Sequence, residues 1–363
     1  MNVTTDQPND RQRQSVLNHA SGVWSAASRY AVVLVLLIAL FVFFSFTQQN
    51  FFTRLNIQNM LSSVSILWVA SIGMTFVVLT AGIDLSVGAL LALSGIVLSK
   101  LFNDLGLPAP LAVVATVAIA ALIGALVNGF LIGKIRLSFF VVTLGTMSLY
   151  TGIVSLWSHT QTTYISSTFI GSIGFGKALG VPTPIWIMIG TFLVAYVVLR
   201  WTYFGRDVYA VGGNIEAARL SGINVARTLM LAYGIAGLGA GIGGVIEVGR
   251  LGAASPQVGG DIPLNAAAAV LLGGTSFLGG VGGVSGTAVG VLFIGTLQNG
   301  LAIAGVQSFW QQVVTGIILI VAIAIDRLQQ GANLLPRKGT TAPAGGAPTV
   351  TAGAAPGPDS PGG

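Results

Sequence analysis

The sequence predicts an all-α integral membrane protein of about ten transmembrane helices, some of them interrupted. Hydrophobic residues make up 53% of the 363 residues, charged residues make up 7%, and the mean hydropathy is +0.86. A soluble domain carries roughly a quarter charged residues. The apolar runs are long and do not alternate with polar residues, and a helix crosses the hydrocarbon with about 20 such residues. The bilayer is therefore the expected solvent.

We expect ten spans, over residues 30–47, 58–79, 86–101, 109–133, 138–158, 184–201, 228–248, 263–279, 284–303 and 308–325. The first is too long, and too far from the N-terminus, for a cleaved signal peptide. A polar segment at 1–28 therefore precedes a transmembrane domain at 29–327. Residues 328–363 are rich in Ala, Gly and Pro and have too little apolar bulk to form a core. We expect this tail to be disordered and cytoplasmic.

Lysine and arginine residues are divided unevenly between the two sides of the predicted membrane. With the N-terminus inside, twelve of the sixteen face the cytoplasm, and the four that face outward are Arg54, Lys100, Lys177 and Arg250. This division agrees with the positive-inside rule. An even number of spans also returns the C-terminus to the cytoplasm.

Several function classes are excluded by composition and spacing. The chain has no cysteine, so disulfides, cysteine-ligated metals and thiol catalysis are ruled out. Its basic residues are scattered between apolar runs, unlike those of nucleic-acid-binding domains. "GAGIGG" at Gly239–Gly244 fits a dinucleotide pattern but lies inside an apolar span, and "GSIGFGKA" at Gly171–Ala178 lacks the Ser or Thr of a P-loop. No nucleophilic triad or metal site can be assembled, since His159 has no second ligand at a suitable spacing.

The glycines in the apolar spans are better explained by packing. Gly237 and Gly241 are four residues apart, as are Gly239 and Gly243, and a third series runs over Gly282, Gly286 and Gly290. Small residues at this spacing allow helices to approach closely.

A carboxylate, Asp84, stands in the apolar stretch "LTAGIDLSVGALLALSG" from Leu79 to Gly95. A charged side chain near the membrane centre costs at least about 2.5 kcal/mol on insertion scales, so it suggests a functional site. Alternatively, Gly82 ends the preceding helix and Asp84 caps a helix that begins near Leu85. The two interpretations overlap, because interrupted helices of transporters place polar helix ends beside the translocation path.

A second break is predicted in "LLGGTSFLGGVGGVSG" at Leu271–Gly286, and one break in each half suggests a transporter built from two related halves. Polar residues in the spans are candidates for a path that would suit a polyol, although hydrogen bonds between helices explain them equally well. These candidates are Asp84, Ser86, Asn128, Thr143, Thr146, Thr275, Ser276 and Asn299, with Ser148 and Gln298 as further polar positions. We expect Glu247 and Arg250 to form an ion pair at an outer helix end.

The most polar segment between spans is the inner loop at 202–227. In it, Gly212 and Gly213 form a break, Asn214 is a suitable N-cap, and "IEAARL" favours a short helix ended by Ser221 and Gly222. Such a helix suits docking into a partner's groove. A solvated basic loop is the alternative.

Four segments resemble the permease subunits of ribose-type ABC sugar importers, over roughly residues 45–327. They are "GIDLSVGALLALSG", "FFVVTLGTMSLYTGI", "FGRDVYAVGGNIEAARLSGINV" and "AAVLLGGTSFLGGVGGVSGTAVG". The resemblance implies a homodimer or a pair of similar permeases in the plasma membrane, ABC ATPase subunits inside that bind ATP and Mg, and an extracytoplasmic sugar-binding protein. It also implies that the loop helix is the coupling helix, with Gly212, Gly213, Asn214, Glu216, Ala217, Ala218, Arg219 and Gly222 as its residues.

The expected function is therefore passage of a monosaccharide or related polyol, driven by ATP hydrolysis in a separate subunit, with no covalent chemistry, no metal and no cofactor in this chain. The main alternative is an ion- or proton-coupled secondary carrier in which Asp84 is the coupling site. A membrane enzyme using Asp84 and His159 is more remote, because the two residues are expected at opposite faces of the membrane.

Overall fold

The computed structural model describes the backbone of residues 31–334 and the side chains as far as residue 324. Described residues 31–326 belong to one compact unit, and described residues 327–334 belong to a second. The predicted polar segment 1–28 and most of the predicted tail lie outside the described residues. The last helix continues to Leu334, past the expected start of the tail at 328.

The described chain is almost entirely helical, as the sequence predicted. After a helix over Ala31–Thr47, the order is α2 (Arg54–Leu79), α3 (Val87–Ser99), η1 (Lys100–Asp104), α4 (Ala109–Ile123), η2 (Gly124–Gly129), α5 (Phe130–Gly133), α6 (Phe139–Ser158), β1 (Thr163–Tyr164), α7 (Thr168–Phe175), β2 (Lys177–Ala178), β3 (Val181–Pro182), α8 (Thr183–Trp201), α9 (Tyr203–Gly213), α10 (Ile215–Leu220), α11 (Val225–Leu251), β4 (Ala253–Ala254), α12 (Ile262–Leu272), α13 (Val284–Ile303) and α14 (Ser308–Leu334). The segments η1 and η2 are π-helical. The two-residue strands pair antiparallel, β1 with β4 and β2 with β3.

Within residues 31–334, seven helices are long and apolar enough to cross a membrane, and three shorter apolar helices cover Ala31–Thr47, Ile262–Leu272 and Ser308–Ala324. These ten segments overlap the ten predicted spans. The largest departure is α12, whose 11 residues extend only about 16 Å, half of a hydrocarbon core of about 30 Å. The remainder of the span expected at 263–279 is loop.

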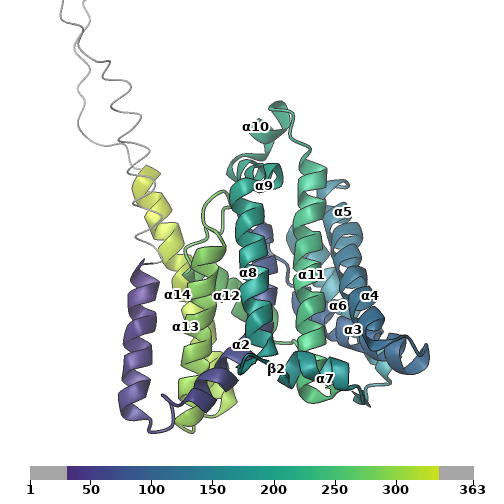
Figure 1. The fold of residues 1–363 in the computed structure, drawn as a ribbon. Coiled ribbons are helices and arrows are strands. Elements are labelled where there is room, and N and C mark those ends of the chain that lie inside the picture. Colours follow the sequence, from purple (N-terminus) through teal and green to yellow (C-terminus); the bar gives the residue numbers. More distant parts are fainter. Residues whose placement is uncertain (1–30, 335–363) are drawn as a thin grey trace, which may run out of the picture. The chain divides into compact units, whose positions relative to one another are not determined.

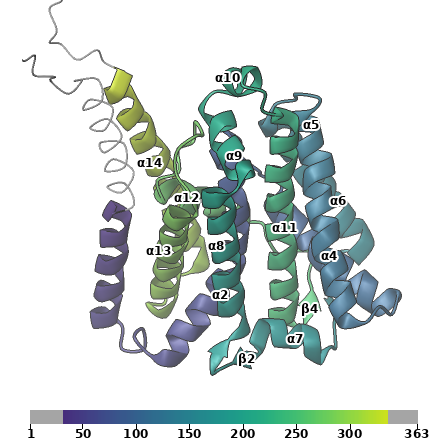
Figure 2. The same cartoon turned by 45° about the horizontal axis from the view of Figure 1, so that its top comes forward.

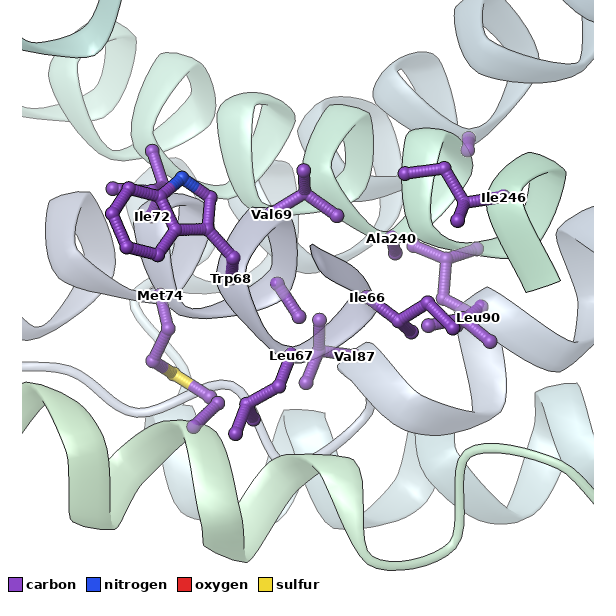
Figure 3. Packing of buried hydrophobic residues seen from close by; sticks show 14 of the residues in the cluster. Ile66, Leu67, Trp68, Val69, Ile72, Met74, Val87, Leu90, Ala240 and Ile246 are labelled. Atoms are coloured by element: carbon purple, nitrogen blue, oxygen red, sulfur yellow. The ribbon is translucent and has the colours of Figure 1, made fainter. Parts of the chain in front are cut away.

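The core is built on α2 and α11, and most residues of both helices are buried. Figure 3 shows side chains from these helices and α3, among them Ile66, Leu90 and Ile246, packed against one another. Glycines of α11 allow this close approach: a Cβ on Gly241 would lie 3.0 Å from the Cα of Val117 on α4. A Cβ on Gly239 would lie 2.5 Å from the carbonyl oxygen of Val69 on α2. The predicted packing role of Gly239 and Gly241 is confirmed, whereas Gly282 of the third predicted series lies in the loop before α13 and not on a helix face.

The outer helices have the opposite character. Large apolar side chains of α4, α6 and α8 are exposed, for example Val114, Val141 and Val194, as expected for surfaces that face lipid. Figures 1 and 2 both show α10 at one end of the bundle and β2 at the opposite end. The helix α11 runs away from α10 for 27 residues, or roughly 40 Å, so it links the two ends.

Candidate functional site

Helix α10 is short and capped by local hydrogen bonds. Asn214 is extended at φ −161°, and its side-chain oxygen accepts from the N–H groups of Glu216 at 3.0 Å and Ala217 at 2.9 Å. The helix ends at Leu220, and Gly222 follows in the left-handed region at φ +83°. Arg219 donates to Glu216 at 3.0 Å on the exposed face. The helix predicted from "IEAARL" and its cap are thus confirmed.

The expected break at Gly212 and Gly213 is wrong, because both glycines are the last residues of α9. The chain turns one residue later, at Asn214. The physical reason for glycine at 212 is packing, since a Cβ there would collide with the carbonyl oxygen of Leu79 and lie 2.6 Å from the backbone nitrogen of Gly280. Nothing lies within 4 Å of a Cβ on Gly213.

The two predicted breaks meet at this contact. Helix α2 ends with N–H groups of Ala81 and Gly82 donating to the carbonyls of Val78 and Val77, the Schellman arrangement that terminates helices. The residue in the left-handed region is Ala81, at φ +63°, instead of the expected Gly82. Across the gap, the N–H of Gly280 donates to the carbonyl of Leu79 at 2.9 Å. The break at 80–86 is therefore hydrogen-bonded to the break at 273–283.

Helix α9 is also tied to the second break by a side chain. The hydroxyl of Tyr209 donates to the carbonyl oxygen of Gly282 at 2.8 Å. Burial raises the pKa of Tyr209, and Arg200 partly offsets this, so the hydroxyl keeps its proton and donates at neutral pH. Within the break, Thr275 accepts from the N–H of Gly283 at 3.3 Å. We use the term break contact for the region in which α9, the break at 80–86 and the break at 273–283 meet.

Asp84 lies in a buried polar network. It is 1% exposed, and its Oδ1 accepts from the N–H of Ser86 at 2.9 Å and from the Ser86 hydroxyl at 2.6 Å. Asn128 donates to the Ser86 hydroxyl at 2.8 Å and approaches Asp84 at 3.4 Å. Asn128 lies on the π-helical segment η2, so a local change of helical pitch orients its amide. The expected cap is wrong in its position: α3 begins at Val87 with Ser86 as its N-cap, and Asp84 binds an N–H that precedes the helix instead of one in its first turn.

The candidate path residues lie in four places. Asp84, Ser86 and Asn128 form the network above, and Thr143 and Thr146 are buried on α6, which packs against α3. Thr275 and Ser276 belong to the break contact. Asn299 lies near the far end of α13, where its amide is paired with that of Asn56 at 2.9 and 3.1 Å.

A cavity of about 510 Å³ opens beside Asn299, at the end of the bundle opposite α10. Its polar lining comes from helix ends: Glu247 and Arg250 of α11, Gln257 and Asp261 from the loop between β4 and α12, Asn265 of α12, and Gln298 and Asn299 of α13. Of the eight path candidates, Asn299 lines this cavity. In the described part of the chain, the other seven line neither this cavity nor those of about 470, 660 and 330 Å³.

The expected ion pair between Glu247 and Arg250 is not formed within the 4 Å that defines a salt bridge in the described residues. Arg250 instead donates to the carbonyl oxygen of Ser62 at 3.2 Å and to the hydroxyl of Ser63 at 2.8 Å, both on α2. Asn265 donates to Asp261 at 2.9 Å. Asp261 and Asn265 were missed in the sequence, although four-residue spacing at a helix start was a usable signal.

Comparison with known protein families matches residues 56–323 to the family described as the permease component of branched-chain amino acid transport systems. The chain belongs to this permease family. It is 42% identical over 311 residues to the ribose import permease protein RbsC of Escherichia coli (strain K12), covering 85% of this chain and 95% of that protein. It is 36% identical over 300 residues to the D-allose transport system permease protein AlsC of the same organism, covering 83% and 92%. It is also 36% identical over 312 residues to the L-arabinose ABC transporter permease protein AraH of Azospirillum brasilense, covering 85% and 90%. No solved structure matches the chain.

As a member of the permease family, the chain is a multi-pass membrane protein and a transport component that performs no catalysis. The resemblance found in the four motifs is confirmed by these relatives. Among the residues that the structure describes, no group of three His, Asp or Glu side chains could hold a metal ion. The geometry instead separates two polar regions, the break contact with α10 at one end and the cavity at the other.

Proposed function

We propose that the chain is the membrane-spanning subunit of an ABC importer for a monosaccharide, with ATP and Mg bound by a separate ATPase subunit. The named cargoes of its relatives, ribose, allose and arabinose, support the substrate class. The observation that carries the coupling to an ATPase is α10, a rigid and capped helix that projects at one end of the bundle (Figures 1 and 2).

Helix α10 is anchored on one side and exposed on the other. Ala218 is buried in a small cluster with Val211, Val225 and Leu229. Leu220, in contrast, is 89% exposed, beside the Glu216 and Arg219 pair. An exposed apolar side chain flanked by charges suits a partner's groove. The coupling role proposed for Gly212, Gly213, Asn214, Glu216, Ala217, Ala218, Arg219 and Gly222 follows from this arrangement, with Leu220 added.

The break contact offers a route from α10 into the membrane. Asn214 separates α9 from α10 without a flexible linker, and α9 touches the end of α2 and the loop before α13. A displacement of α10 by an ATPase would therefore move both interrupted segments. Nucleotide binding can drive transport only by favouring one of two conformations, and this contact is where such a bias would enter.

The charge distribution supports an orientation with α10 in the cytoplasm. Arg136 and Arg219 line one cavity beneath α10, whereas Arg250 lines the cavity at the opposite end. Positive residues favour the cytoplasmic side. In this orientation both termini are cytoplasmic, the cavity faces outward toward a sugar-binding protein, and a second permease copy completes the pathway in the bacterial plasma membrane.

The carrier alternative has less support. A coupling ion must reach its site from water, but Asp84 is 1% exposed and is bound to Ser86 and Asn128. Among the described residues, Asp84 lines neither the cavity of about 510 Å³ nor those of about 470, 660 and 330 Å³. The hydrogen bonds to Oδ1 support a structural role for Asp84, while its Oδ2 is buried without a hydrogen-bond partner among the described residues.

Co-purification with candidate ABC ATPase subunits tests the proposal. We expect wild-type chain to retain an ATPase in detergent, and both Leu220→Asp and the pair Glu216→Lys with Arg219→Glu to release it. Leu179→Asp is the matched control, because Leu179 is 91% exposed in the turn between β2 and β3 at the other end. If wild type purifies alone and moves solute into vesicles without ATP, the carrier alternative is correct.

A further inference from the structure

The cavity at the end opposite α10 lies between α2, α11, α12 and α13 and has a volume of about 510 Å³. We propose that it is the site in which the sugar rests after its delivery to the membrane subunit and before its passage. This inference rests on the proposed function and adds the residues that hold the cargo. The volume falls in the range of about 300 to 1,000 Å³ that is typical of small-ligand sites.

The polar side chains of this cavity match a polyhydroxyl ligand. Glu247 and Asp261 supply carboxylate acceptors, and Asn265 and Gln298 supply amides that both donate and accept. Sugar hydroxyls also donate and accept, so each can be satisfied by such groups. The three charged residues that line the cavity, Glu247, Asp261 and Arg250, carry a formal charge of −1 in sum, which does not favour an anion.

The geometry leaves part of this set available. The side-chain amide of Asn265 donates to Oδ2 of Asp261 at 2.9 Å. This hydrogen bond holds the carboxylate in place and leaves its Oδ1 to accept from a ligand. Arg250 is fixed to α2 through Ser62 and Ser63, so it positions the rim without forming a salt bridge to Glu247 among the described residues. These contacts preorganise the site, which reduces the ordering cost of binding.

The other walls are apolar and close the cavity on its inner side. Met60, Val64 and Leu67 come from successive turns of α2, and Leu91 comes from α3. Figure 3 shows Leu67 within the packed core. A sugar that enters must therefore stop here until helices move. None of the residues that line the cavity is aromatic, so the site lacks a stacking platform and suits a ligand that is held weakly and released.

Isosteric substitutions test the site in the reconstituted transporter, with its ATPase and binding protein, using labelled D-ribose, D-allose and L-arabinose. We expect Glu247→Gln and Asp261→Asn each to lower uptake about tenfold, since one hydrogen bond to a charged group corresponds to roughly that factor. ATP hydrolysis should persist, because α10 and the break contact are unchanged. Asp104→Asn is the matched control: Asp104 is exposed and paired with Lys100 outside the cavity.

Cysteine labelling supplies a readout that does not depend on uptake alone. The chain has no native cysteine, so Gln298→Cys carries a single thiol inside the cavity. We expect a membrane-impermeant maleimide to label it from outside, D-ribose in excess to slow the labelling, and the labelled protein to lose uptake. Tyr164→Cys, at an 80% exposed position on β1, is the control that should be labelled without losing uptake.

The outcomes separate the two proposals. If wild type transports one of the sugars but both isosteric variants do so at the wild-type rate, the cavity is not the sugar site and the importer proposal stands. Unimpaired uptake by labelled Gln298→Cys also overturns the site. If wild type moves none of the sugars when supplied with ATPase and binding protein, the proposed function itself fails.

Discussion

Gly212 offers a strict test of the break contact, because its neighbour provides a built-in control. A Cβ on Gly212 would collide with the carbonyl oxygen of Leu79, which accepts the hydrogen bond from Gly280. Gly213 is adjacent on the same helix, and a Cβ there meets nothing within 4 Å. We therefore expect Gly212→Ala to force α9 away from the end of α2, and Gly213→Ala to leave the contact intact.

Three contributions determine the expected change in the free energy of unfolding. Inserting a methyl group into a packed contact costs about 1 to 3 kcal/mol, and losing the Gly280 to Leu79 hydrogen bond adds about 0.5 to 1.5 kcal/mol. Replacing glycine by alanine in a helix gains up to about 1 kcal/mol, but both variants share this gain. The two variants should thus differ by roughly 1.5 to 4.5 kcal/mol in the free energy of unfolding.

Thermal unfolding in detergent, followed by tryptophan fluorescence, measures the difference. We expect Gly212→Ala to unfold at a lower temperature than wild type, and Gly213→Ala at the wild-type temperature or above it. Transport should follow the same order, since the proposed coupling passes through this contact. If Gly212→Ala unfolds together with Gly213→Ala, α9 does not rest on α2 and the reasoning is refuted.

Three other predictions concern single interactions. Asn214→Ala removes the cap of α10 and should weaken ATPase retention in the co-purification assay, at a helix cost of about 1 kcal/mol; equal retention would show that the cap is not needed for docking. Asp84→Asn keeps an acceptor for Ser86 and should fold and transport, whereas Asp84→Ala leaves buried donors unpaired and should lower stability by about 1 to 3 kcal/mol. A folded Asn variant that cannot transport would instead favour the carrier. Thr75 and Thr287 share a buried hydrogen bond of 2.8 Å, so the double change to valine should destabilise less than the sum of the single changes, a relation that thermal unfolding of the four proteins tests.

The membrane spans could be predicted because long apolar runs have few alternatives in lipid. The end of α12 could not, since "AAAAVLLGG" is apolar up to the glycines and hydropathy alone does not register where a helix stops. Helix α9 was missed for the related reason that Gly212 and Gly213 are poor helix formers. The opposing carbonyl of Leu79, which no sequence pattern reveals, explains why a glycine is required at position 212 of that helix.

The candidate site was predictable where local chemistry determines structure. Asn214 before "IEAARL" specifies its cap within three residues, and that helix formed as expected. The sequence does not reveal the role of polar residues in the membrane spans, because a translocation path and a hydrogen-bonded contact between helices use the same kinds of side chain. Asn128 was equally suited to both, and only its hydrogen bonds to Asp84 and Ser86 assign it to the Asp84 network.

The two polar regions are joined by the helices that border both. Helix α2 contributes Met60 to the cavity and ends at Leu79 in the break contact. Helices α12 and α13 also border both regions. They contribute Asn265 and Gln298 to the cavity, and the glycine-rich loop that connects the two helices belongs to the break contact. Because α2 and α13 are also bonded through Thr75 and Thr287, they should respond together when α10 is displaced. A permease that alternates its access needs such elements, since a force applied at α10 can alter the cavity only through structure continuous between the two.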